Sequence, residues 1–306
     1  MLNSLKKLVR SGMSWLKTGF FCLLTLFSPR LNTQLHFLVN TGRPANLHSP
    51  QSFREKISWL KLYRYAGDSL AIQCADKLAV RAYVREKGFG SLLNELIGVY
   101  RTPEEIPWDE LPDAFVLKWN FGSGYNCVVR SKKELCSAQA ARRLKRWKRK
   151  KYWLLYSELQ YKTADKYILC ERFLDTAPGQ ELLDYKFYCF HGVPKAILVI
   201  DRSGQEKRGV FMTPEWKIIS DIPGKYAPFQ PPKPESLIRM RAAAAKLSEP
   251  FPYVRIDFYE WRGQAVFGEM TFTPGAGIFA SETLLNGKEM GEYILLQNQK
   301  NQGDIL

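Results

Sequence analysis

The sequence predicts an α+β fold, in which strands pair as hairpins and a smaller number of helices pack against them. Strand-like segments follow one another with only a turn between them, as residues 185–190 and 195–200 do across a His-Gly-Val-Pro turn. Stretches with helical character stand apart from these strands, at 52–62, 76–86, 137–151 and 237–247. Because strands and helices do not alternate regularly, a parallel α/β sheet fits the sequence less well.

The composition indicates a globular and strongly basic protein. The chain has 306 residues, 45% of them hydrophobic, which is enough for one large core or two modest ones. Its net charge of +15 implies an anionic partner: nucleic acid, a phosphate-bearing substrate or an acidic membrane surface. No nucleic-acid-reading motif occurs, so nucleic acid is not the expected partner.

The six cysteines are widely spaced, without a CxxC pair, and several lie in apolar strand-like segments. This spacing favours reduced thiols in a cytoplasmic protein over a disulfide framework. The three histidines are also scattered, so a zinc site of the His/Cys type has no support in the sequence.

Residues 1–50 form a basic and apolar N-terminal extension. Basic residues precede the first acid, Glu55, and flank an uncharged apolar run over residues 18–28. This run is shorter than the ~20 residues that a membrane-spanning helix needs. It also lacks the small-residue cleavage site of a signal peptide. We expect residues 1–30 either to form an interfacial helix on the anionic inner face of the plasma membrane or to pack on the folded body.

Two carboxylates are expected to face each other across a β-hairpin in the C-terminal part of the chain. The segments on either side of Gly263 alternate between apolar and polar residues. A turn centred there places Asp257 opposite Glu269 and Arg255 opposite Thr271. Opposed side chains lie ~4.5–5.5 Å apart at Cβ, where like charges repel. Arg255, a raised carboxyl pKa or a hard divalent cation would relieve the repulsion; the alternative is an ordinary salt bridge on a solvated face.

Further residues suit phosphate binding. Lys118 ends an apolar strand at a turn that contains Gly122 and Gly124, where an ammonium group and backbone N–H groups can meet phosphate oxygens. Lys186 and Glu171 lie on strand-like segments of their own. Each of these residues is also explained as a surface residue. Together with the carboxylate hairpin they meet the needs of ATP chemistry, which are charge neutralisation and positioning.

Arginine and lysine dominate the helix candidate at residues 137–151, with Trp147 among them. Such a run fits a solvated helix face, and it leaves open a contact with an acidic polymer or a membrane.

The order of these motifs resembles the TupA-like branch of the ATP-grasp enzymes, which is associated with teichuronopeptide and other cell-surface polysaccharide synthesis. The resemblance covers most of the chain and rests on an ordered set of segments. These segments are 41–61, 76–77, 115–118 with 122–124, 158–162, 168–173, 184–187, 255–257 and 268–277.

The resemblance implies an ATP-grasp fold, in which two α+β lobes clasp ATP and Mg²⁺. It also assigns residues to the nucleotide: Lys118 with Gly122 and Gly124 at the phosphates, Lys77 as a further nucleotide contact, Glu171 beside the adenosine, and Lys186 near the nucleotide or the acceptor.

The same resemblance assigns Asp257 and Glu269 to Mg²⁺ and makes Arg255 and Lys186 the catalytic residues, with Arg255 stabilising the transferring phosphoryl group. Thr271 is the third metal-site candidate. The superfamily commonly has Asn there, and a threonine hydroxyl is a poorer ligand, which puts a second metal ion in doubt. The loop after the hairpin, residues 273–277, would face the acceptor.

The activity that the resemblance implies is an ATP- and Mg²⁺-dependent carboxylate–amine ligase that works through an acyl phosphate. It would join an amine or amino acid to an acidic sugar or cell-surface polysaccharide. The alternatives are phosphoryl transfer to a sugar hydroxyl, a glycosyltransferase-like role, and a non-catalytic protein that binds acidic polymers. The corresponding domains are an N-terminal helical region at 51–112 and an ATP-grasp domain at 113–300.

Overall fold

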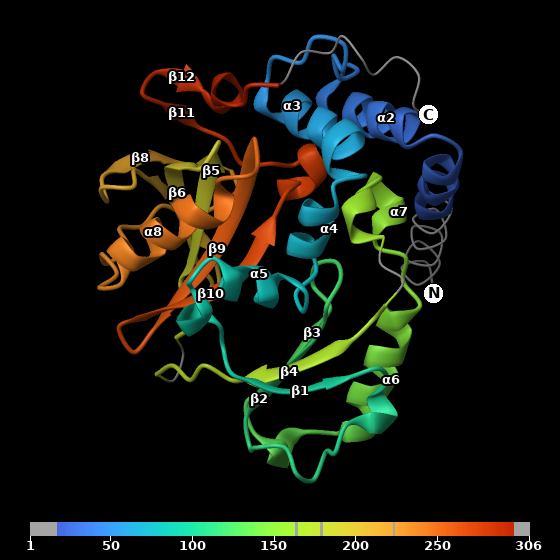
Figure 1. Ribbon diagram of the computed structural model, residues 1–306, viewed down its shortest axis with the longest axis vertical. Helices are drawn as coiled ribbons and strands as arrows, with labels where there is room; N and C mark the ends of the chain where they lie inside the picture. The colour runs from blue at the N-terminus through green and yellow to red at the C-terminus, as the bar shows by residue number, and fades with distance from the viewer. Residues whose placement is uncertain (1–16, 163–164, 178–179, 223, 297–306) are drawn as a thin grey trace, which may run out of the picture.

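A computed structural model describes residues 17–162, 165–177, 180–222 and 224–296, which form two lobes with a group of helices along one side (Figure 1). The expectations for residues 1–16 and 297–300 lie outside the described residues. The helices are α2 Pro29–Thr41, α3 Phe53–Leu60, α4 Ser69–Ala75, α5 Val80–Glu86, α6 Ser137–Lys148, α7 Trp153–Tyr156 and α8 Leu237–Ser248. The strands are β1 Leu96–Tyr100, β2 Phe115–Trp119, β3 Asn126–Val129, β4 Ile168–Arg172, β5 Asp184–Phe190, β6 Val193–Asp201, β7 Arg208–Met212, β8 Ile218–Asp221, β9 Tyr253–Trp261, β10 Gln264–Thr271, β11 Leu284–Leu285 and β12 Lys288–Glu289.

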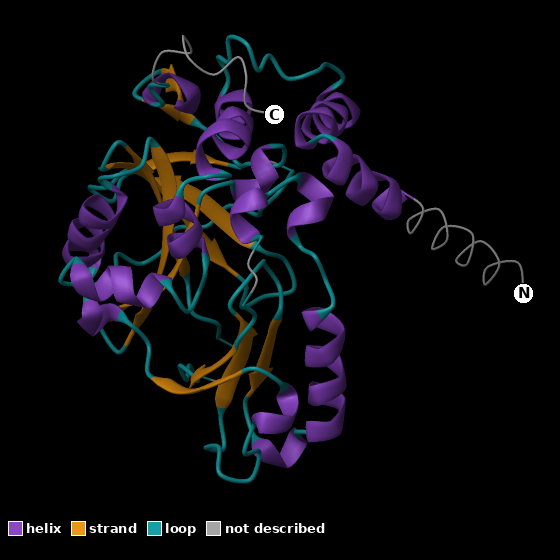
Figure 2. Cartoon of the chain, turned by 45° about the vertical axis from the view of Figure 1, so that its right-hand side comes forward, coloured by secondary structure: helices purple, strands orange, loops and turns teal. Residues whose placement is uncertain are grey.

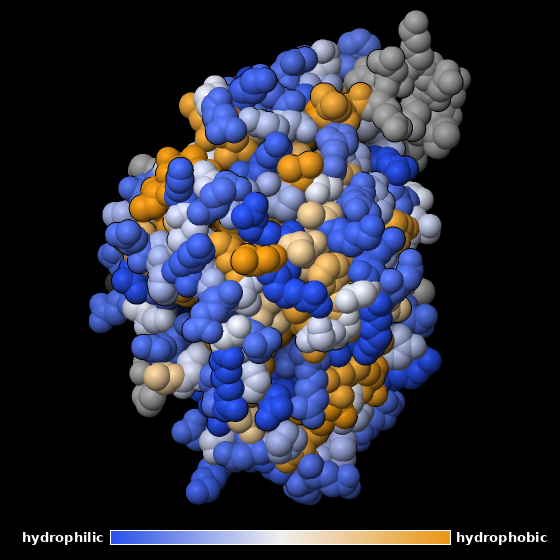
Figure 3. Space-filling model, turned by 60° about the vertical axis from the view of Figure 1, so that its left-hand side comes forward, coloured by the Kyte–Doolittle hydropathy of each residue, from blue (hydrophilic) through white to orange (hydrophobic). Residues whose placement is uncertain are grey.

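The larger lobe is built on an antiparallel sheet of six strands in the order β10-β9-β5-β6-β7-β8. Helix α8 packs across β5, β6 and β9 (Figure 1). On β9 the apolar members of the alternating pattern, Val254, Ile256 and Phe258, are fully buried. The polar members of the same strand therefore point to the other face of the sheet, toward the smaller lobe. With the left-hand side of Figure 1 turned forward, the surface is mostly hydrophilic, with separate apolar patches (Figure 3).

The smaller lobe has a four-stranded antiparallel sheet in the order β1-β4-β2-β3. On β2, Phe115, Leu117 and Trp119 are buried in a cluster with α6, and Trp119 Nε1 donates to Leu144 O at 3.2 Å. Lys118 alternates with them and faces the larger lobe. Because β1 belongs to this sheet, the region predicted as helical over 51–112 also supplies a strand, and a boundary at residue 112 divides the sheet.

The predicted helices are present, with shifted ends. Helix α3 begins at a capping box formed by Ser52 and Glu55, and a short π-helix, Lys61–Tyr65, continues it beyond the predicted end. Residues 17–27 are also helical and lead through Ser28 into α2. These N-terminal helices and α6 lie along the same side of the molecule (Figure 2). All six cysteines are free, as the sequence predicts.

Candidate active site

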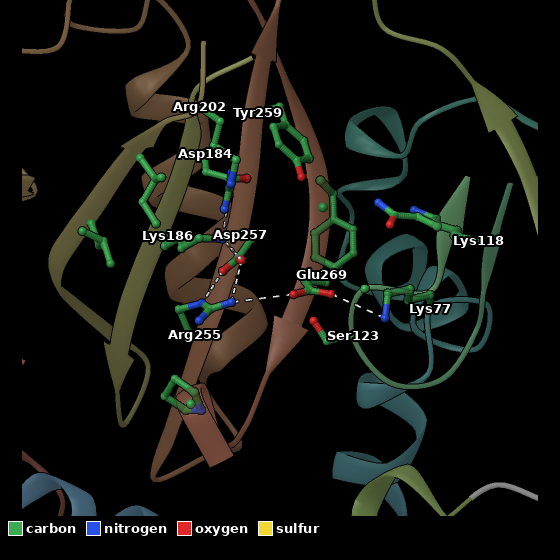
Figure 4. A pocket seen from close by; sticks show the side chains of 18 of the residues that line it. Lys77, Lys118, Ser123, Asp184, Lys186, Arg202, Arg255, Asp257, Tyr259 and Glu269 are labelled. Atoms are coloured by element: carbon green, nitrogen blue, oxygen red, sulfur yellow. Dashed lines mark hydrogen bonds and ion pairs between the residues drawn. The ribbon is translucent and has the colours of Figure 1, made fainter. Parts of the chain in front are cut away.

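A cavity of about 660 Å³ lies between the two lobes (Figure 4). It brings together all the site residues that the sequence predicts except Thr271. Six basic and four acidic side chains line it: Lys77, Lys118, Lys186, Arg202, Lys225 and Arg255, with Glu171, Asp184, Asp257 and Glu269. An excess of positive charge in a cavity of this size suits an anionic ligand.

Lys186, Asp257 and Glu269 form a row across three neighbouring strands, β5, β9 and β10. In the next row on the same face, Arg255 lies opposite Thr271. Both cross-strand pairs that the sequence predicts are confirmed. The sheet thus carries two carboxylates and two cations side by side on the face that lines the cavity.

The register of this hairpin depends on a bulge. The chain turns at Arg262 and Gly263, whose φ angles are 52° and 71°, and such a two-residue turn alone would place Asp257 opposite Gly268. A bulge at Gly268 shifts the pairing by one residue, so that Asp257 meets Glu269 instead. The sequence does not predict this bulge.

Two cations hold the buried Asp257 carboxylate. Arg255 donates from Nε to Oδ1 at 2.6 Å and from Nη2 to Oδ2 at 2.7 Å, and Lys186 Nζ donates to Oδ2 at 2.5 Å. Burial acts to raise the pKa of Asp257, but Arg255 and Lys186 outweigh it, and the pKa lies below its usual value. The pKa of Arg255 is held well above its usual value against burial, chiefly by Asp257. Arg255 and Lys186, and not a raised pKa of Asp257, thus compensate the charge of this carboxylate.

Glu269 connects the two lobes. Its Oε2 lies 3.5 Å from Lys77 Nζ, and its Oε1 lies 3.6 Å from Arg255 Nη2. Lys77 Nζ also donates to Gly122 O at 2.6 Å, which holds the glycine loop beside the carboxylate. Gly122 and Gly124 both have positive φ, and a Cβ at position 122 would overlap a tyrosine ring. Glycine is therefore required where this loop approaches the cavity.

Lys118 and Glu171 form a second cluster, on the smaller lobe. Lys118 Nζ lies 2.7 Å from Glu171 Oε2, and Arg81 Nη1 lies 3.3 Å from Oε1. Asn94 Nδ2 donates to Oε2 at 3.4 Å. A phosphate that binds Lys118 must therefore compete with Glu171 for its ammonium group.

The cavity also contains residues that the sequence analysis does not single out, namely Asp184, Arg202, Tyr259 and Ser123 (Figure 4). Asp184 forms an ion pair with Arg202 and lies 3.5 Å from Lys186 Nζ. Burial, together with Asp184, raises the pKa of Tyr259 well above its usual value, so its hydroxyl stays protonated. Strand alternation could have identified two of them, because Asp184 lies two residues before Lys186 and Tyr259 two after a predicted carboxylate.

A fully buried lysine, Lys61, binds the loop after β10. Lys61 Nζ donates to Tyr156 O at 2.8 Å and to Ala276 O at 3.1 Å, and burial lowers the pKa of Lys61 to about 8. Beside it, Thr273 Oγ1 donates to Glu158 at 2.6 Å, and burial raises the pKa of Glu158. Ala276 has φ 56°, a strained value for a residue with a side chain. These buried contacts keep the loop in place at the edge of the cavity.

Asp257 and Glu269 fit a magnesium site. Mg²⁺ prefers oxygen ligands and is commonly held by one or two carboxylates together with substrate phosphates. Within the described ranges no three His, Cys, Asp or Glu side chains gather as a metal site, so phosphate oxygens would complete the ligand set. Thr271 Oγ1 donates to Glu269 Oε1 at 3.3 Å and accepts from Arg255 Nη2 at 3.0 Å. Thr271 thus contacts Glu269 and Arg255 but does not line the cavity, unlike the other two metal-site candidates.

Comparison with known proteins gives one family. A model of the family described as TupA-like ATPgrasp matches residues 55–295. No curated protein sequence matches the chain.

Several solved structures are similar at low identity. D-alanine–D-alanine ligase from Bacillus anthracis is 17% identical, with 67% of this chain and 59% of that chain covered and a TM-score of 0.43. The enzyme of the same name from Helicobacter pylori is 15% identical, with 74% and 61% covered and a TM-score of 0.40. N5-carboxyaminoimidazole ribonucleotide synthetase, as its ADP complex, is 13% identical, with 72% and 51% covered and a TM-score of 0.43. The chain thus spans less than two thirds of the length of each.

Proposed function

The chain belongs to the TupA-like ATP-grasp family and has the ATP-grasp fold, and we propose that it is an ATP- and Mg²⁺-dependent carboxylate–amine ligase. It joins an amine or amino acid to the carboxyl group of an acidic sugar or cell-surface polysaccharide. One observation carries the proposal: the row of Lys186, Asp257 and Glu269 faces Lys77 and the glycine loop across a single positively charged cavity.

The reaction has two steps. A carboxylate oxygen of the acceptor attacks the γ-phosphorus of ATP, the bond to the bridging oxygen breaks, and ADP leaves. The amine then attacks the carbonyl carbon of the acyl phosphate, loses a proton and expels inorganic phosphate, leaving an amide. Asp257 and Glu269 would hold Mg²⁺, which would supply neutralisation of the negative charge on the phosphates.

The side chains of this cavity serve the first step through charge and position. Arg255 is fixed by Asp257 through Nε and Nη2, and the same Nη2 lies 3.6 Å from Glu269 Oε1, so its guanidinium group would stabilise charge that develops on a phosphoryl group beside these carboxylates. Lys77, between α4 and α5, holds the glycine loop and adds a second positive charge beside Glu269. Lys186 lies in the same row and can meet either the nucleotide or the acceptor carboxylate.

The test is calorimetric titration with ATP, with and without Mg²⁺, on the wild type and on an Asp257→Asn, Glu269→Gln double variant. We expect Mg²⁺-dependent binding by the wild type and loss of that dependence in the variant. Asp201→Asn is the control, because Asp201 is a buried carboxylate of the same sheet that pairs with Arg208 outside the cavity. Absence of ATP binding by the wild type would rule out the proposal.

Product analysis separates the ligase from phosphoryl transfer. Uronic acids and amino acids are offered in pairs with Mg²⁺ and ATP, and both ADP and free phosphate are measured. A ligase releases ADP and phosphate in equal amounts, and only when the uronic acid and the amino acid are both present. Release of ADP without phosphate, with a phosphorylated sugar as product, would identify phosphoryl transfer instead.

We also propose that the N-terminal helices attach the protein peripherally to an anionic membrane surface. Their polar side chains face the body of the protein: Thr25 and Asn32 bond to Ser157, and His36 bonds to Leu155 O. Phe37 is buried, but seven other apolar side chains of these helices are exposed, which is unusual for a helix at the surface of a protein. These exposed residues are Phe20, Leu23, Leu26, Phe27, Leu31, Leu38 and Val39.

The charge of this segment agrees with an anionic surface. Lys17 and Arg30 flank the exposed apolar residues, and the first acid in the sequence is Glu55. No helix within the described residues is long and apolar enough to cross a bilayer. A helix that lies in the interface, with apolar side chains inserted among the headgroups, needs no such length.

Co-sedimentation with vesicles of phosphatidylglycerol and phosphatidylethanolamine tests this attachment. The double variant Leu23→Asp, Phe27→Asp replaces two apolar residues that are 68% and 84% exposed, and we expect this change to abolish binding to the vesicles. Ile238→Asp with Leu295→Asp, at residues 82% and 69% exposed elsewhere on the surface, is the matched control and keeps binding. Equal binding by both double variants would contradict attachment through these helices.

A further inference from the structure

A second hollow, of about 790 Å³, lies between strand β3 and helix α6. Four arginines line it, and we call it the arginine groove: Arg130, Arg142, Arg143 and Arg146. Glu134 is the one acidic side chain among its described lining residues. The groove is thus strongly positive, and it is of the size that ligand sites have.

The arginines of α6 lie close together, and one of them, Arg143, is held by the fold through Asn126 O and the Trp147 ring. Arg142 and Arg146 are four residues apart and Arg143 and Arg146 three, so all three share one side of the helix, where like charges repel. All three are exposed. Within the described ranges, Arg142 and Arg146 have no ion-pair partner, while Arg130 pairs with Glu181. An anionic ligand in the groove would relieve this repulsion.

The arginine groove adjoins the catalytic cavity. Asn126 lines the cavity and its neighbour Cys127 lines the groove. Arg143 Nη2 donates to Asn126 O at 2.9 Å, which fixes one arginine at the junction. Strand β3 is the last strand of the small sheet, so its outer edge faces the groove and not another strand. Asn126 and Cys127 point to opposite faces of the sheet, so a chain that passes over this edge from the groove would reach the cavity on the other face.

From this arrangement we infer that the arginine groove binds the body of a carboxylate-bearing polysaccharide and leads its reacting carboxyl group to the cavity; the inference rests on the proposed ligase function. Guanidinium groups bind carboxylates through two parallel hydrogen bonds, which suits a polymer with one carboxylate on each sugar. The backbone groups at the edge of β3 can bond sugar hydroxyls. Strong salt dependence follows, because the contacts are made between exposed charges.

The experiment measures binding of fluorescently labelled oligogalacturonate to the full chain at low salt, with neutral dextran and a single-stranded oligonucleotide as competitors. Arg142→Gln with Arg146→Gln removes two charges from the groove. Lys145→Gln with Arg149→Gln removes two charges from the helix and its C-cap, at residues that do not line the groove. We expect the groove variant to bind about tenfold more weakly and the control to change less than about threefold.

Three results would overturn the inference: equal losses in the two variants, competition by dextran, or competition by the oligonucleotide as strong as that by unlabelled oligogalacturonate. The first means a general charge effect, the second a neutral sugar site and the third a nucleic-acid surface. ATP calorimetry on the same samples keeps the two proposals apart. Binding of Mg²⁺-ATP but not of oligogalacturonate by the wild type would contradict only the inference about the groove. Binding of oligogalacturonate but not of ATP would contradict the proposed ligase function.

Discussion

Asp257 on β9 lies directly opposite Glu269 on β10 because Gly268 bulges out of the pairing between the two strands. A Cβ atom at position 268 would lie 2.9 Å from the Asp257 carbonyl oxygen, closer than such contacts come. The two carboxylates therefore share one face of the sheet through a residue that has no side chain.

Gly268→Ala should weaken Mg²⁺-dependent ATP binding. The added methyl group pushes against the backbone of β9, so the two carboxylates can no longer keep their spacing, and we expect about a tenfold loss of affinity. Calorimetry on the variant measures it. Gly67→Ala is the control, because a Cβ at position 67 meets nothing within 4 Å. Unchanged Mg²⁺-ATP affinity in Gly268→Ala would show that the bulge does not set the site.

Much of this site could be predicted because it lies within a single hairpin. Alternation of apolar and polar residues is a local property, so it indicated which face of β9 carries Asp257 and Arg255. The pairing with Glu269 is confirmed although the turn alone would give another register. A glycine inside a strand often marks a bulge, so Gly268 is a local signal for this one, but a glycine alone does not fix the register.

Contacts between distant segments lay beyond the local patterns. Lys77 precedes Glu269 by almost two hundred residues, and only the resemblance to a family placed both at the nucleotide. Arg81 reaches Glu171 from helix α5, and no local pattern in either segment indicates it. Contacts that depend on how distant segments pack together can be identified only from the three-dimensional fold. The face on which a residue of a single strand lies can be predicted from the sequence.

Lys77→Met should weaken ATP binding and loosen the glycine loop. The Lys77 ammonium group contacts both Gly122 O and Glu269, so its loss removes a positive charge from the cavity and a tie between the lobes. We expect about tenfold weaker Mg²⁺-ATP binding and faster amide hydrogen exchange at residues 122–125. Lys87→Met, outside the cavity, serves as the control. Normal exchange at the loop with weakened binding would mean that Lys77 acts through its charge alone.

Arg255→Gln should lower stability in a pH-dependent way. In the wild type the pKa of Asp257 lies below its unfolded value of about 3.9, so its contribution is complete above that pH and is lost as the pH falls through the folded pKa. Without Arg255, burial dominates and the pKa of Asp257 rises. At pH 7 Asp257 remains charged in the variant but has lost one of its two cation partners. We expect the free energy of unfolding to fall by about 3 kcal/mol, the low end for a broken buried pair, because Lys186 remains.

Denaturant unfolding at pH 7 and pH 4 measures the effect of Arg255→Gln. The difference from the wild type should shrink at pH 4, because Asp257 can then be neutralised by a proton in the variant. Arg262 belongs to the same hairpin and makes an exposed ion pair with Asp175, so Arg262→Gln should change stability by less than about 1 kcal/mol at either pH. A loss for Arg255→Gln that is the same at both values would mean that Asp257 keeps its low pKa without the arginine.

Lys61→Met should displace the loop after β10. Its ammonium group supplies hydrogen bonds to Tyr156 O and Ala276 O, and each buried carbonyl left without a partner costs about 1–3 kcal/mol. We expect a higher KM for the acceptor with unchanged Mg²⁺-ATP affinity, because the loop and not the carboxylate pair moves. Lys56→Met is the matched control: Lys56 belongs to α3 just before Lys61 and donates to Ile294 O at 2.9 Å, away from the cavity.

The pH dependence of stability checks the burial of Lys61 independently of activity. Burial lowers its pKa to about 8, whereas an unfolded lysine titrates near ~10.4. Between these values the folded protein releases a proton that the unfolded chain retains, so the free energy of unfolding gains a contribution from Lys61 as the pH rises from about 8 to about 10. Lys61→Met lacks this contribution, so the wild type should gain stability relative to the variant over that window. Parallel curves for the two proteins would mean that Lys61 keeps its charge with an ordinary pKa, and that its ammonium group reaches water.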